Sequence, residues 1–233
     1  MRRIGAEIED RRTAIEDAIE TATPLPDKGD VMAVSYDGVM APMRETNAVA
    51  WREAGVASVS IYGPGDAGPE KLDTRHLARM PESGMVTLLQ QIADQVARAK
   101  KGRVFREFAI ICDGKNTFWK AAMTQPVLHD AVWILDFYHA SENLTKAAKA
   151  IFGDDDESNR CHRMRYAEFI ARGLPIGSGP VESAAKNRNI VLARLKRSGV
   201  RWSRDGGQHV HDLRVYLKSG RWEPMWYTMV TAA

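Results

Sequence analysis

FAIICDG, residues 108–114, and AVWILDF, residues 131–137, are the two stretches that decide the fold. Each is a short apolar run that ends at an acid and precedes a segment of helical composition. Such runs are typical of central strands that are covered on both faces. We therefore expect two buried strands, with Asp113 and Asp136 at the points where they end.

The upstream sequence predicts the rest of a sheet. Apolar and β-branched residues favour three more strands, and the turn signal Gly63-Pro64-Gly65-Asp66 favours an antiparallel meander. Helical spacing of apolar residues favours helices around the two buried strands. The predicted strands cover 31–39, 57–62, 71–77, 108–112 and 131–137, and the predicted helices cover 85–100, 116–125 and 141–152. The β-β-β-α-β-α-β-α order predicts an α/β fold with one mixed sheet flanked by helices.

Breaks in composition divide the chain into three predicted parts. The chain opens with helical composition, and a break with Pro and Gly follows at 23–30. We predict an N-terminal helix and linker over 1–30, a main domain over 31–197, and a basic helical extension over 198–233.

The overall composition is that of a soluble globular protein, with 44% hydrophobic and 27% charged residues. No apolar stretch approaches the roughly 18 residues of a membrane span, and the N-terminus lacks the apolar core of a signal peptide. Cys112 and Cys161 have neither a disulfide framework nor metal-ligand spacing. We expect a cytoplasmic protein with no membrane partner.

Basic residues gather near the C-terminus, although the net charge is only +3. Residues 184–226 hold ten Lys or Arg against three acids. A local basic surface attracts a phosphate backbone, but a solvated helix face gives the same count. The candidate DNA-binding residues are Lys186, Arg188, Arg194, Lys196, Arg197, Arg201, Trp202 and Arg204.

Three acids stand where chemistry could use them. Asp37 ends the first predicted strand, Asp113 ends the strand after the long helix, and Glu182 lies in the first turn of a helix that starts near Ser178-Gly179-Pro180. Each alone is more typical of a turn residue or a helix cap. Carboxylates at adjacent strand ends repel one another unless a cation lies between them, and Mg²⁺ prefers oxygen ligands. We therefore predict that all three bind Mg²⁺ or Mn²⁺, in an arrangement suited to in-line phosphoryl transfer.

Asp136 and His139 form a fourth element after the last strand. Asp136 is the alternative second acid, because it also ends a parallel strand. His139 has an auxiliary role in this hypothesis: it could donate to a carboxylate, ligate a metal or touch DNA. It could equally be a satisfied, partly buried histidine.

The chain resembles the transposases of bacterial insertion sequences, in the ISKra-type group of the Mutator-like branch. The resemblance runs from about residue 31 to 226 through VSYDGV, WREAGVASVSIY, ICDG, WILDFYHASENL, GLPIGSGPVESA, RLKRSGVRWSRDGGQ and LKSGRW. The most specific of these motifs are LDFYHASENL and GLPIGSGPVESA.

This resemblance implies a ribonuclease H-like catalytic domain that cleaves and joins DNA at insertion-sequence ends with Mg²⁺ or Mn²⁺. Asp37, Asp113 and Glu182 resemble the family's Asp-Asp-Glu triad, and Asp136 with His139 resembles the acid-x-x-His element. The implied partner is DNA, with a homo-oligomer assembled on it and association with the nucleoid when bound.

Two departures from the family keep other functions open. Only 36 residues precede Asp37, and the family's helical insertion is shortened near 153–175. The alternative is therefore an inactive remnant that binds DNA or a partner. A generic ribonuclease H-like nuclease is a third possibility, which the family-like tail makes less favourable.

Overall fold

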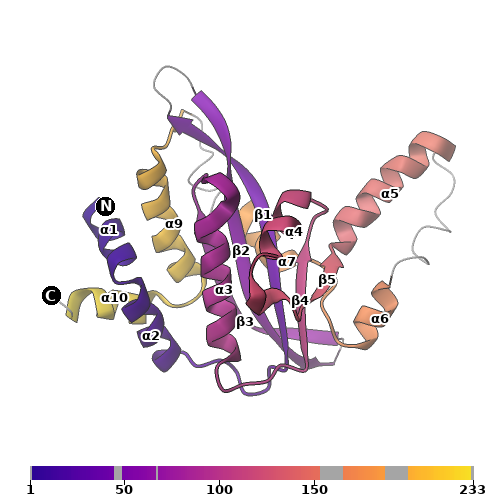
Figure 1. Ribbon diagram of the computed structural model, residues 1–233, viewed down its shortest axis with the longest axis horizontal. Coiled ribbons are helices and arrows are strands. Elements are labelled where there is room, and N and C mark those ends of the chain that lie inside the picture. Colours follow the sequence, from indigo (N-terminus) through magenta and orange to yellow (C-terminus); the bar gives the residue numbers. More distant parts are fainter. Residues whose placement is uncertain (1, 45–48, 67, 153–164, 187–198, 232–233) are drawn as a thin grey trace.

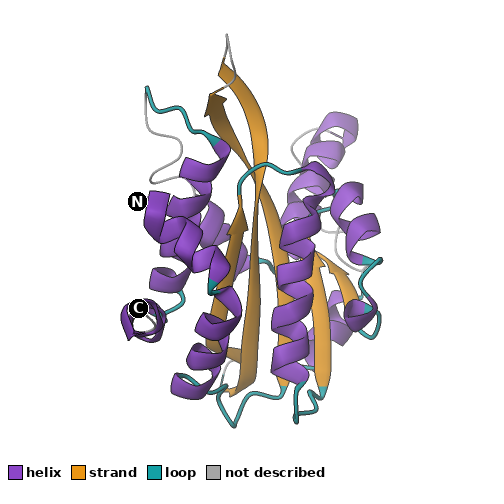
Figure 2. Ribbon diagram, turned by 60° about the vertical axis from the view of Figure 1, so that its left-hand side comes forward, coloured by secondary structure: helices purple, strands orange, loops and turns teal. Residues whose placement is uncertain are grey.

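The computed structural model describes residues 2–44, 49–66, 68–152, 165–186 and 199–231. Its centre is a five-stranded sheet with helices on both faces (Figures 1 and 2). The strands are β1 (Val31–Arg44), β2 (Val49–Gly65), β3 (Gly68–Arg79), β4 (Glu107–Cys112) and β5 (Val132–Leu135). Their order in the sheet is β3-β2-β1-β4-β5. The predicted α/β class and mixed sheet are confirmed.

The sheet combines an antiparallel meander with a parallel half. β1, β2 and β3 pair antiparallel, whereas β4 pairs parallel with β1 and β5 pairs parallel with β4. The two apolar stretches form β4 and β5. β4 is buried as predicted, whereas the prediction for β5 is wrong: it is an edge strand, and Ile134 is its one buried residue. This arrangement is compatible with a ribonuclease H-like fold.

Helices cover the two faces of this sheet. On one face, α3 packs on β2 and β3; on the other, α7 packs on β1 and β2. The helices of the central part are α3 (Val86–Lys100), α4 (Asn116–Ala122), α5 (Phe137–Phe152), α6 (Tyr166–Ala171) and α7 (Gly179–Lys186), with short 3-10 turns η1 (Ser83–Met85) and η2 (Pro126–Leu128). The core is divided accordingly, with one apolar cluster beneath α3 and α4 and two on the opposite face.

β1 and β2 are longer than predicted and continue past the ends of their neighbours (Figure 1). β4 ends at Cys112, opposite Tyr36, whereas β1 pairs with β2 as far as Arg44. Trp202 supports the extension: its amide donates to the Pro42 carbonyl at 3.0 Å, and its carbonyl accepts from the Arg44 amide at 2.8 Å. We call this two-stranded extension, residues 38–44 with 49–55, the ribbon.

The N-terminal and C-terminal helices share one cluster of the core. They are α1 (Arg2–Asp10), α2 (Arg12–Ala22), α9 (Arg204–Lys218) and α10 (Trp222–Thr231). The first two replace the single helix expected near the N-terminus, since the chain turns at Arg11. Ile8 packs with Val215 and Met229 in this cluster, and α1 contacts α9 while α2 contacts α10. Close approach requires glycine: a Cβ on Gly207 would lie 2.4 Å from the Met80 side chain.

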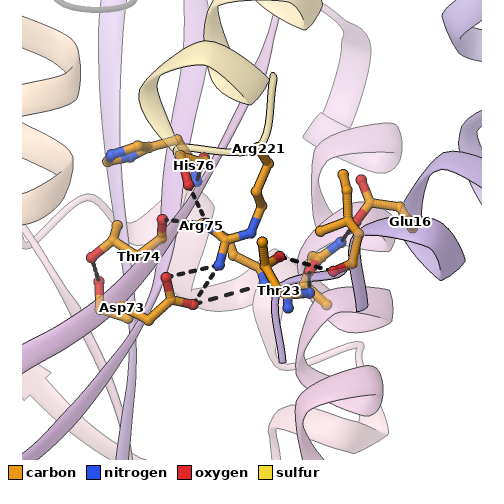
Figure 3. A network of polar contacts seen from close by, with 11 residues as sticks. Glu16, Thr23, Asp73, Thr74, Arg75, His76 and Arg221 are labelled. Atoms are coloured by element: carbon orange, nitrogen blue, oxygen red, sulfur yellow. Dashed lines mark hydrogen bonds and ion pairs between the residues drawn. The ribbon is translucent and has the colours of Figure 1, made fainter. Parts of the chain in front are cut away.

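Polar contacts join β3 to the turn between α9 and α10 (Figure 3). The Arg221 guanidinium donates to both carboxylate oxygens of Asp73, at 2.8 and 2.6 Å. The His76 amide donates to Ser219 Oγ at 2.9 Å. Arg221 is 5% exposed, so one of the ten basic residues counted near the C-terminus is a buried ion-pair partner and belongs to no DNA-binding surface.

Within the described ranges, none of the helices combines the length and the apolar character that crossing a bilayer requires.

His211 on α9 is a buried histidine without a hydrogen-bond partner in the described part of the chain. Its exposure is 0%, and neither ring nitrogen is bonded. Burial, with Arg79 and Arg214 nearby, lowers the pKa of His211 from 6.5 to about 3. The unfolded chain therefore binds a proton between these pH values that the folded chain does not, and stability falls as the pH drops below 6.5.

We predict that His211→Leu stabilises the protein by about 1 kcal/mol at pH 7.5, because it removes an unsatisfied buried polar group. At pH 5 the parent loses about 2 kcal/mol through this residue, and the variant does not. Urea unfolding between pH 5 and 7.5 measures both effects. His129→Gln, at an exposed position, is the control. An equal pH slope in parent and His211→Leu would contradict this assignment.

Candidate metal centre

The sheet register places three aspartates at one edge. Tyr36 lies opposite Cys112, and Cys112 lies opposite Leu135, across three neighbouring parallel strands. Asp37, Asp113 and Asp136 each follow directly after one of these residues. Because adjacent strands are about 4.8 Å apart, the three backbones are close neighbours. The three aspartates are therefore neighbours in the backbone, as predicted, but Asp37 does not end its strand, because β1 continues to Arg44.

Asp136 is fully buried at the junction of β5 and α5, and its side chain also bonds to the loop before α7. It precedes α5, and its Oδ1 accepts from the His139 amide at 2.9 Å, which is an N-cap bond. Its Oδ2 accepts from the Ser178 amide, and its own amide donates to the Cys112 carbonyl at 2.9 Å. The carboxylate thus joins the end of β5, the start of α5 and the loop before α7.

Glu182 reaches the same place from the first turn of α7. Ser178 Oγ donates to Glu182 Oε1 at 3.2 Å, and His139 Nε2 lies 3.5 Å from the same oxygen. Gly177 allows the Tyr138 ring to lie against the loop before α7, because a Cβ there would lie 2.7 Å from that ring. Glu182 and His139 are both half-buried, so solvent reaches the cluster from one side.

Asp136, His139 and Glu182 form the candidate metal centre. Each offers one ligand atom, and these atoms lie within 4.8 Å of one another. Two carboxylates suit Mg²⁺ or Mn²⁺, and an imidazole nitrogen adds a third donor. Asp136 is buried with a second acid nearby, which favours a cation between them. The donor set therefore fits a divalent cation, although the same contacts also cap α5 and hold α7.

Asp37 and Asp113 lie outside this group of three. Asp113 is half-buried, and its Oδ1 accepts from the Lys115 amide at 3.1 Å, as in a turn after a strand. Asp37 is half-buried and lies opposite Val56 on β2. In the described ranges, neither belongs to a set of three ligand side chains within 4.8 Å.

Both aspartates nonetheless affect Tyr36. Burial, then the Glu53 carboxylate, and then Asp113 and Asp37 raise the pKa of the Tyr36 phenol. Tyr36 donates to Glu53 Oε1 at 3.2 Å, and Lys115 Nζ forms an ion pair with the same carboxylate. This Tyr36–Glu53–Lys115 contact was not predicted, since no motif links the three residues.

Ser178 is the other residue that sequence analysis did not assign to the site. It bonds to Asp136 through its amide and to Glu182 through its hydroxyl. The available signal was the Ser-Gly-Pro sequence, which we used only to predict the start of a helix.

The predicted DNA-binding residues are only partly described. Arg201 and Arg204 are exposed, Trp202 is half-buried against β1, and Lys186 is the last residue of α7. Arg188, Arg194, Lys196 and Arg197 lie outside the described residues.

No protein-family model matches the chain, and no curated protein matches it. Among solved structures, NurA with manganese is 12% identical with a TM-score of 0.15, over 96% of this chain and 61% of that one. NurA bound to dAMP and manganese is 11% identical with a TM-score of 0.14, over 95% of this chain and 59% of that one. The chain thus spans about three-fifths of these NurA chains. TM-scores this low carry no argument about fold or function.

We predict that Mn²⁺ binds at this centre and raises the melting temperature. At an ion concentration 100 times Kd, the stabilisation is about 2.7 kcal/mol. Glu182→Gln keeps the shape but removes a ligand charge, so we expect Mn²⁺ binding to weaken at least about tenfold. Electron paramagnetic resonance of free Mn²⁺ measures the affinity. Glu142→Gln, at an exposed position on α5, is the control. Equal affinity in all three proteins would remove Glu182 from the centre.

Proposed function

We propose that this chain is the catalytic domain of a DNA transposase with a ribonuclease H-like fold, which cleaves and joins DNA strands with the help of divalent metal ions. The observation that carries the proposal is the cluster of Asp136, His139 and Glu182 beside the ends of the parallel strands. The sheet order and the transposase-like motifs support it.

The proposed chemistry is in-line phosphoryl transfer. Metal ions held by the acids would bind phosphate oxygens and stabilise the charge that develops on the attacking and leaving oxygens. The protein itself would mainly position the reacting groups. A water molecule would attack a phosphodiester in the cleavage step, and a 3′-hydroxyl would attack in the joining step. A homo-oligomer on DNA belongs to the same proposal.

Different observations support each of the proposed catalytic acids. Glu182 is the final acid of the proposed set, and Asp136 is favoured as the second acid because its carboxylate lies beside Glu182 and His139. Asp113 is the alternative second acid, and its side chain turns back to the Lys115 amide. Asp37 is the proposed first acid, since it follows Tyr36 at the same sheet edge.

A specific observation also favours the second candidate function, a binding module without catalysis. Both carboxylate oxygens of Asp136 accept backbone hydrogen bonds, which is sufficient reason for an acid at that position. In this alternative, the cluster stabilises the fold and the chain binds DNA or a partner without cutting it.

We predict that the protein nicks supercoiled DNA with Mg²⁺ or Mn²⁺ and stops in chelator. Asp37→Asn should lower nicking at least about a hundredfold, because it removes a ligand charge at almost constant volume. Comparing Asp113→Asn with Asp136→Asn identifies the second acid. Asp130→Asn is the control, because Asp130 is exposed and lies just before β5 in the sequence, whereas Asp136 follows it. Thermal melts show whether each variant is folded.

Two results would favour the binding module instead. One is a parent protein that binds Mn²⁺ and nicks nothing. The other is nicking that survives unchanged in Asp37→Asn and in both second-acid variants, which would trace the cleavage to a contaminating nuclease.

A further inference from the structure

A concave feature lies beside the ribbon, and none of the metal-centre residues lines it. It is a groove of about 420 Å³ whose walls include Arg44 on β1, Arg52 on β2 and Arg204 at the start of α9. All three residues are exposed. Arginines from three separate elements therefore line one groove.

Two acids also line this groove, but both are engaged elsewhere. Glu53 accepts from the Tyr36 hydroxyl at 3.2 Å and forms an ion pair with Lys115. Glu82 Oε1 accepts from the Leu88 amide at 2.8 Å, at the start of α3. Among the described residues, Arg44 and Arg204 form no ion pair with either acid. The described lining therefore holds three arginines against two acids, and Lys115 pairs with one of those acids, so the net charge around the groove is positive.

The arginines are carried by well-fixed backbone. Arg44 donates its amide to the Trp202 carbonyl, and the Ser203 side chain accepts from the Gly206 amide at 3.1 Å to cap α9. Arg204 is the first residue of that 15-residue helix, whose N-terminal end adds a partial positive charge. The fork geometry of a guanidinium group matches the oxygens of a phosphate.

We propose that this groove binds the phosphodiester backbone of a nucleic acid, at a distance from the reacting phosphate. The inference deepens the proposed function and rests on it for the identity of the ligand. Arg44 lies seven residues beyond Asp37 on β1, which is about 23 Å at 3.3 Å per residue. A phosphate bound beside Arg44 is therefore separate from one held at the ends of the parallel strands. Such contacts fix the position of the strand and are independent of sequence.

The test is a binding measurement that needs no catalysis. Fluorescence anisotropy in chelator follows a labelled 30-base-pair duplex of arbitrary sequence at several salt concentrations. For the triple variant Arg44→Ala, Arg52→Ala and Arg204→Ala, we expect at least about tenfold weaker binding at 0.1 M salt. The slope of log K against log salt should fall by up to about 2.7, or 0.9 for each lost contact. Arg→Lys at the same three positions keeps the charge and should retain most of that slope.

The matched control removes three charges elsewhere: Lys28→Ala, Lys71→Ala and Lys101→Ala, all at exposed positions. A loss confined to the arginine variant supports the groove, even if the parent never nicks DNA. Equal losses in both triple variants show a net-charge effect only and overturn the proposal. Unchanged affinity and slope, or a parent that binds no duplex, also overturn it. Competition by inorganic phosphate at micromolar concentration would instead identify a small-anion site.

Discussion

The register between β1, β4 and β5 is the constraint on which the rest of the structure depends. It sets Tyr36 beside Cys112 and Cys112 beside Leu135, and one residue further along each strand carries an aspartate. A shift of one residue in either pair would exchange the faces of β4, so that Ile110 and Ile111 would swap the separate apolar clusters in which they pack. The buried isoleucines of β4 and β5 therefore fix both the core and the position of the acids.

β4 could be predicted from sequence because a strand that is covered on both faces must be apolar throughout, whereas the similar apolar run of β5 forms an edge strand. The extension of β1 could not, because it depends on Trp202, which lies far along the chain and bonds to Pro42 and Arg44. The approach of Glu182 to His139 could not be predicted either, because it depends on where α7 packs on the sheet. For Arg221 the sequence-based prediction is wrong. The residue was counted toward a basic surface, but its guanidinium is buried and bonded to Asp73.

Asp136 has two roles, one in stabilising the fold and one in the candidate metal centre. Its carboxylate satisfies the amides of His139 and Ser178, and it stands beside Glu182. A negative charge at the start of α5 is favourable because the helix dipole is positive there. The acid is thus compatible with the fold in the absence of an ion, and its backbone partners hold the side chain in one orientation. Such preorganisation is what a metal site requires of its ligands.

The shared core of the two chain ends has a consequence for biosynthesis. Arg11 donates to the Met229 carbonyl, 218 positions further along. A ribosome adds about 5–20 residues per second, so α1 and α2 would wait roughly 10–40 seconds for α10. Until then Ile8, Ile15 and Ile19, fully buried in the folded protein, lack the part of their shared cluster that α9 and α10 supply. The packing of α1 and α2 is therefore complete only after α10 has been synthesised.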